Sequence, residues 1–180
     1  MSANSIGWGK CSIIIKDLDD TSSKWTKIAT PKEDSTKLST NKGDKVEATI
    51  EGGENEDTKY KKSTYTLEYL IRRNASRKKP MVDVDGVISH HYGVFVQPEN
   101  IAVPGPYLPK TVASLDEAFD TTDGGQMTYD HDTLSPDDGG KQVRWGTITQ
   151  DLSKLKEGAT IEDTAFDFKD VDVDSTPKGS

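Results

Sequence analysis

A mainly β protein is the fold class that this sequence predicts, as an antiparallel β-sandwich or barrel with one short helix, long loops and extended terminal arms. The strongest observation lies between Gly43 and Ile71, where two runs alternate apolar and polar residues around the polar loop Gly52–Asp57. Such alternation places one set of side chains on a buried face and the other in water. The β-branched run Ile13–Ile15 is typical of a buried strand. We therefore expect a β domain, with a hairpin or two neighbouring strands between residues 43 and 71.

The elements along the chain follow from similar patterns. Further strands are expected at Lys24–Thr30, Met81–Ile88, Val94–Val96 and Lys141–Thr149. The four prolines within Gln97–Pro109 predict an extended loop, and the Asp/Gly-rich segment Asp120–Gly140 predicts turns. Thr111–Phe119 is the best short helix, because Ser114 could cap it with Glu117 three residues later, and Val112, Leu115 and Phe119 would share one face. One helical turn is expected around Leu152 and Leu155.

The chain is expected to form one domain with two arms. The β domain spans residues 10–158, after an N-terminal arm at 1–9 and before an acidic C-terminal arm or edge strand at 159–180. Leu, Ile, Val and Phe make up about 19% of the 180 residues, just below the ~20% at which disorder becomes a concern. Two interpretations remain open: an ordered domain with large polar loops, or a subunit that buries part of its surface against copies of itself.

Composition excludes several classes of protein. A net charge of −8 disfavours a general nucleic-acid binder. The single cysteine, Cys11, allows no internal disulfide, and its isoleucine neighbours indicate a small core residue. We expect no signal peptide, because residues 1–9 are polar, and no membrane partner, because no apolar stretch approaches a membrane span.

Residues with catalytic or metal-binding potential do not form a recognisable site. His90 and His91 are adjacent, so they would point to opposite faces of a strand, and His131 lies far along the chain. The aspartates of the 130–138 segment do not have EF-hand spacing, although they could gather around an ion. We expect no catalytic residues, no structural metal and no cofactor.

Charge segregation is the sharper signal. Between Lys59 and Lys79 eight basic residues and one acid give a net +7, and between Thr111 and Gly140 eight acids without Lys or Arg give −8. These segments could be solvated faces, an intramolecular match, a nucleic-acid site on the basic side, or a heterologous interface between copies. In the last case, the basic side comprises Lys59, Lys61, Lys62, Arg72, Arg73, Arg77, Lys78 and Lys79. The acidic side comprises Asp116, Glu117, Asp120, Asp123, Asp130, Asp132, Asp137 and Asp138.

One pattern resembles a known family. The strand Asp44–Glu51, the following Gly-Gly-Glu and the strand Thr64–Ile71 look like the major tail tube proteins of tailed bacteriophages and related contractile systems. The resemblance covers Cys11 to Arg73. It implies a β-sandwich or barrel subunit with a small helix that forms hexameric rings. Such rings stack into a tube that conducts the genome, and a long hairpin or loop and the terminal arms bridge subunits.

The resemblance defines the leading expectation for function. The chain would be a virion structural protein, not an enzyme, assembled in the bacterial cytoplasm with itself and with other tail proteins. DNA would pass through the lumen without specific binding, because an acidic lumen repels phosphates. The alternatives are a tail terminator, a capsid decoration protein, or a carbohydrate- or ion-binding β-sandwich that uses Trp8, Trp25, Trp145 and the Asp-rich loops.

Overall fold

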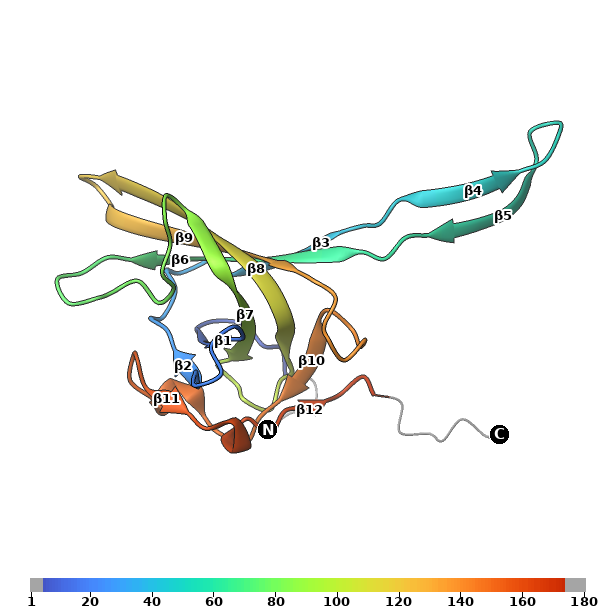
Figure 1. Cartoon of the computed structure of the whole chain (residues 1–180). Helices are drawn as coiled ribbons and strands as arrows, with labels where there is room; N and C mark the ends of the chain where they lie inside the picture. Colours follow the sequence, from blue (N-terminus) through green and yellow to red (C-terminus); the bar gives the residue numbers. More distant parts are fainter. Residues whose placement is uncertain (1–4, 174–180) are drawn as a thin grey trace.

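Antiparallel strands form almost all of the regular structure. The computed structural model describes residues 5–173 (Figure 1). Its larger sheet has ten strands, and every pairing within it is antiparallel. These strands are β1 (Cys11–Asp17), β2 (Trp25–Lys27), β3 (Lys37–Asn41), β6 (Thr64–Arg72), β7 (Val87–Pro98), β8 (Gly105–Asp120), β9 (Gly124–Thr133), β10 (Arg144–Thr147), β11 (Thr160–Ile161) and β12 (Lys169–Asp170). The predicted mainly β fold is confirmed.

The main path of the sheet runs β11-β2-β1-β7-β8-β9-β6-β3, with β10 joining the start of β8 to β12. Its larger core draws side chains from β1, β7, β8, β9 and β6 together. The sheet therefore curves around this core. The segment after β2 crosses to β6, where the Lys32 amide donates to the Leu70 carbonyl at 2.8 Å. This arrangement is consistent with a β-sandwich.

A smaller core covers the opposite face of the central strands. Ile14 and Phe95 point into it, whereas their neighbours Ile13, Ile15 and Val94 point into the larger core. The C-terminal segment supplies the cover. Its Phe166 stacks on Trp25, with ring centroids 4.3 Å apart, and Phe168 packs edge-on against Phe95. Residues 159–173 therefore lie on the body. The short strands β11 and β12 fit the edge-strand expectation rather than the mobile arm; residues 174–180 lie outside the described part.

The helix expected at Thr111–Phe119 is wrong, because this segment belongs to β8. Thr111, Ala113 and Leu115 are buried and alternate with exposed neighbours, which is the burial pattern of a strand. β8 lies between β7 and β9 and is hydrogen-bonded to both. The pairing with two long strands overrides a weak local preference for helix.

Helical structure is limited to two short 3-10 turns within residues 5–173. These are η1 (Leu152–Lys154) and η2 (Asp163–Ala165), and η1 confirms the turn expected around Leu152. The Asp151 side chain caps η1 by accepting from the Ser153 amide. Neither turn has the length or apolar content of a membrane-spanning helix.

Two segments expected to be loops contain strands. β9 occupies ten residues within Asp120–Gly140, and β8 already begins at Gly105 inside the proline-rich segment. The inward residues Met127 and Tyr129 of β9 alternate with polar ones, a signal that the Asp/Gly turns on either side obscured. The Asp/Gly turns themselves are present on both sides of β9.

A buried polar network crosses the larger core. His131 is fully buried between the Tyr69 hydroxyl, 2.8 Å from its Nε2, and Thr111 Oγ1, 3.0 Å from its Nδ1. Thr111 donates its single hydroxyl proton to the Tyr92 carbonyl, so it must accept from His131 Nδ1–H. Tyr69 then donates to Nε2. This geometry fits the neutral imidazole, and burial lowers the pKa of His131 to about 3.

This network makes stability depend on pH. The unfolded chain binds a proton on His131 below its ordinary pKa near 6.5, whereas the folded chain does not until about pH 3. Stability is therefore lost as pH falls below 6.5. We expect His131 to account for roughly 2–3 kcal/mol of lost unfolding free energy between pH 6.5 and 4.5. In His131→Gln this part of the loss should vanish, although the variant is less stable at pH 7. Urea unfolding of both proteins at several pH values measures the difference; parallel pH profiles would contradict the assignment.

Candidate functional site

A two-stranded ribbon projects from the body and is the most distinctive surface of the molecule. β3 and β6 pair from Lys37 with Glu68 to Asn41 with Thr64. The ribbon then continues as the separate sheet formed by β4 (Lys45–Thr49) and β5 (Asn55–Tyr60). Figure 1 shows it extending far from the core. From Lys42 to Ile50 the chain would span about 27 Å at the rise of a β-strand.

The ribbon corrects two expectations. The polar loop expected at Gly52–Asp57 is shorter than predicted, because β5 begins at Asn55; the turn itself is confirmed at Gly52 and Gly53, which both have positive φ. The apolar set of Val46, Ala48 and Ile50 does not reach the core either. Every residue of β4 and β5 is exposed. The strand alternates as predicted, but it has no sheet or helix to pack against.

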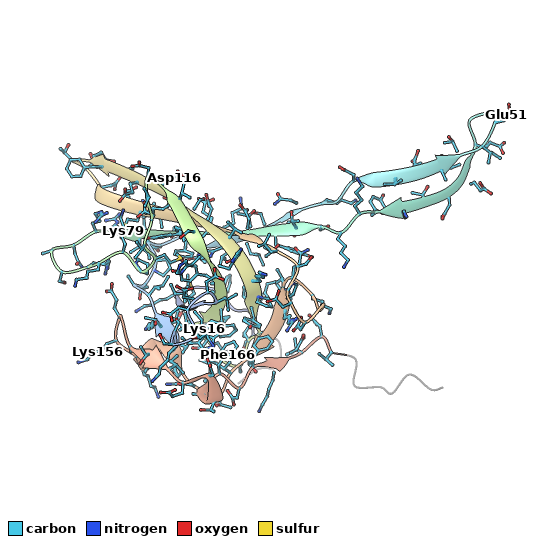
Figure 2. All side chains as sticks on the ribbon, in the orientation of Figure 1. Lys16, Glu51, Lys79, Asp116, Lys156 and Phe166 are labelled. Carbon is cyan, nitrogen blue, oxygen red and sulfur yellow. The ribbon has the colours of Figure 1, made fainter. Side chains whose placement is uncertain are left out.

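The outer end of the ribbon is acidic around one apolar side chain. The Ile50 amide donates to the Glu54 carbonyl at 2.9 Å, which closes the tip. Ile50 remains 47% exposed. Between Ile50 and Thr58 there are four carboxylates and no basic residue: Glu51, Glu54, Glu56 and Asp57. Figure 2 shows Glu51 at this tip, on the opposite side of the molecule from Lys79 and Lys156.

Several residues of the predicted basic side already have partners within the chain. The Arg73 guanidinium lies 2.6 Å from the Glu117 carboxylate, which Lys79 also reaches at 2.9 Å. Arg72 lies 3.7 Å from Asp123. The hydrogen bonds from Lys79 and Arg73 lower the pKa of the Glu117 carboxyl. The cause is the sheet order, since β9 pairs with both β6 and β8 and so brings the two charged segments together. For Arg72, Arg73 and Lys79 the structure therefore shows the intramolecular match between the basic and the acidic segment.

The other basic residues divide between the ribbon and the loop after β6. Lys59, Lys61 and Lys62 lie on or beside β5, at the base of the ribbon, and Lys61 is 4.0 Å from Asp44. Arg77 pairs with Glu157 at 2.9 Å. Lys78 is exposed and makes no ion pair with another residue of the described range 5–173.

The predicted acidic side does not form one surface. Asp120 and Asp123 lie at the β8–β9 turn, whereas Asp137 and Asp138 lie in the loop after β9 and pair with Lys110 and Arg144. Only three of its members lie on the outward sheet face. These are Asp116, Asp130 and Asp132, which are joined there by Glu68.

This outward face concentrates like charges. Glu68 on β6 stands directly opposite Asp130 on β9, and Asp132 accepts a hydrogen bond from Thr66 at 2.7 Å. Partial burial and the carboxylates of Glu68, Asp116 and Asp132 raise the pKa of Asp130. Lys37 on β3 faces Glu68 at the margin. We call Glu68, Asp116, Asp130 and Asp132 the acidic face; it would repel phosphate groups.

The histidines and the free thiol each have a local partner. His90 lies 2.6 Å from the Asp17 carboxylate, which raises the pKa of the histidine, and His91 lies 2.9 Å from Asp19. Cys11 packs against the larger core and donates to Thr36, and burial raises the pKa of its thiol. Within residues 5–173 no three His, Cys, Asp or Glu side chains gather in a metal-binding cluster.

The tryptophans do not form a common surface. Trp25 is 4% exposed inside the smaller core, where it stacks on Phe166. It is therefore unavailable for the sugar contact that the carbohydrate-binding alternative assigns to it. Trp8 and Trp145 are exposed to 78% and 41%.

No protein-family model and no curated protein matches this sequence.

We expect the two adjacent lysines of the loop after β6 to differ in their effect on folding. Lys79→Glu places a carboxylate against Asp83 and Glu117, which Lys79 now contacts at 2.7 and 2.9 Å. It should lower the melting temperature. Lys78→Glu is the matched control, since the side chain is exposed and unpaired within residues 5–173, and it should leave the melting temperature unchanged. Thermal unfolding by circular dichroism compares them; equal melting temperatures would show that the Lys79 contacts carry no stability.

Proposed function

We propose that this chain is a virion structural protein, a tail tube subunit that assembles with copies of itself into stacked hexameric rings, which form a conduit for genome delivery. The observation that carries the proposal is the projecting ribbon. A two-stranded hairpin is marginally stable in water by itself. Here all eleven residues of β4 and β5 are exposed, including Val46 and Tyr60. A neighbouring subunit would cover these side chains.

The acidic face supports the conduit part of the proposal. Four carboxylates on adjacent strands give the outward side of β6, β8 and β9 a negative potential. Such a wall lining a lumen would keep DNA phosphates from binding, so that DNA slides through. The ring number and the position in a tail come from the resemblance to tail tube proteins. The proposed place of action is the virion, after assembly in the bacterial cytoplasm with other tail proteins.

Other structural roles in a virion would use the same ribbon. A tail terminator or capsid decoration protein would also bind neighbouring subunits through it, but would cap a structure instead of extending it. Negative-stain images of concentrated protein separate these roles. A tail tube subunit should give stacked rings or tubes, and a capping subunit should give nothing longer than a single ring. A carbohydrate-binding module should stay monomeric and gain thermal stability with its ligand.

Removing the ribbon tests the proposal. The Lys61 amide donates to the Asp44 carbonyl at 2.8 Å, so a two-residue Asn-Gly turn in place of residues 45–60 can join these two positions. Residues 45–60 supply no core residue, and we therefore expect the shortened chain to melt at the same temperature as the full chain. It should no longer assemble in sedimentation velocity experiments. If the shortened chain assembles at the same concentration as the full chain, the proposal is rejected.

Hydrogen exchange gives an independent test without mutation. In the dispersed chain the β4–β5 amides should exchange fast, because nothing covers this hairpin, whereas the amides of β7 and β8 should be protected. In the assembled protein the β4–β5 amides should become protected. Equal exchange of the ribbon in both states would mean that it remains free in the assembly.

A further inference from the structure

We propose that the acidic tip of the ribbon docks into a basic pocket on the next copy of the chain, at the side of the body away from its own ribbon. This inference rests on the proposed function and names the surface that would receive the ribbon. A contact between two different surfaces of one chain is heterologous, and it builds rings when the rotation closes and filaments when it does not.

The receiving pocket lies between the end of β2 and the loop after β6. Its volume is about 480 Å³. Its floor consists of Ile28, Ala29 and Ile71, which are at most 3% exposed, and of the half-buried Pro80, while the consecutive basic residues Arg77, Lys78 and Lys79 stand at one side. Lys27 also lines it, and Glu157 is the single acid. The pocket thus combines a narrow apolar floor with an excess of positive charge.

The basic residues of this pocket differ in whether they already have a partner within the chain. Arg77 is held by Glu157 and by the Arg72 carbonyl, and Lys79 by Asp83 and Glu117. Lys27 donates to the Leu155 carbonyl. Lys78 is exposed and makes no ion pair within residues 5–173, so we infer that it forms the principal contact with an incoming carboxylate.

The ribbon tip has the complementary chemistry. Ile50 is an exposed apolar side chain at the end of a narrow hairpin, and Glu51 and Glu54 flank it on either side of the turn. Positive φ angles at Gly52 and Gly53 keep this turn tight, so that the tip can enter a pocket. Insertion would place Ile50 against the apolar lining and a carboxylate beside Lys78. The opposite electrostatic potentials of the tip and the pocket also favour this docking orientation over others.

The position of the two surfaces fits a chain of subunits. In Figure 2, Glu51 lies at the far end of the ribbon, and Lys79 lies across the body from it. The ribbon therefore points away from the pocket of its own chain, and only a second copy could bring the tip and the pocket together. A second basic hollow, lined by Lys62 and Lys141, lies at the base of the ribbon on the loops beside β5 and β10. It provides the matched alternative site for the experiment.

Crosslinking between two variants of the full chain tests the docking. Both carry Cys11→Ser; one carries Glu54→Cys and the other Lys78→Cys. A short thiol-reactive crosslinker should join them into a heterodimer after mixing. The control replaces Lys78→Cys with Lys141→Cys, another exposed lysine, and should give little product. Sedimentation velocity on the same samples reports assembly separately.

The outcomes separate the inference from the proposed function. Crosslinking through position 78 but not 141 supports both. Assembly without crosslinking at 78, or with crosslinking at 141 instead, overturns the docking site and leaves self-assembly standing. A chain that stays monomeric and does not crosslink overturns both.

Charge exchange gives a second, non-covalent measurement. Glu54→Lys or Lys78→Glu alone should raise the concentration required for assembly, by about tenfold if the two charges meet in the contact. The double variant, which restores opposite charges, should return to the concentration of the original chain. Additive effects in the double variant would show that the two residues do not meet.

Discussion

Burial of the central strands on both faces is the constraint from which the rest of this structure follows. Ile13, Ile14 and Ile15 of β1 are all buried, as are the residues from Tyr92 to Gln97 of β7. Both sides of these strands must therefore be covered by other parts of the chain. One side is covered when the long sheet curves around the larger core, and the other when the C-terminal segment lays Phe166 and Phe168 over Phe95.

Specific contacts fix this double cover. The buried Gln97 side chain donates to the Gln150 carbonyl and accepts from the Leu152 amide, both at 2.8 Å, so it ties the C-terminal segment to β7. At the start of β8, a side chain on Gly105 would lie 1.9 Å from the Val96 carbonyl oxygen. Only glycine permits this close approach of the two strands. The buried centre is thus complete within one chain.

Stability and the proposed assembly depend on different parts of the molecule. The ribbon beyond Asn41 leaves the region that the cores cover, and its residues contribute to neither core. The loop after β6 is instead fixed by ion pairs with β8 and with Glu157. In the proposed assembly, the ribbon tip and the loop after β6 would bind other copies without disturbing the core. That division agrees with the general observation that binding segments come from the less stable parts of a fold.

The sequence by itself determined the β class, the strands at Ile13–Ile15 and Thr64–Ile71, and the turn at Gly52–Gly53, because these depend on β-branched residues, on local alternation and on glycine. It left β9 hidden between Asp/Gly turns, although Met127, Tyr129 and His131 alternate with polar residues. Only the tertiary structure decided that Thr111–Phe119 is a strand, since two neighbouring strands pair with it. Only the tertiary structure brought Arg73 to Glu117 and placed Lys79 across the body from Glu51 at the ribbon tip. Charge along the chain shows which residues could attract one another, but strand order decides which of them meet.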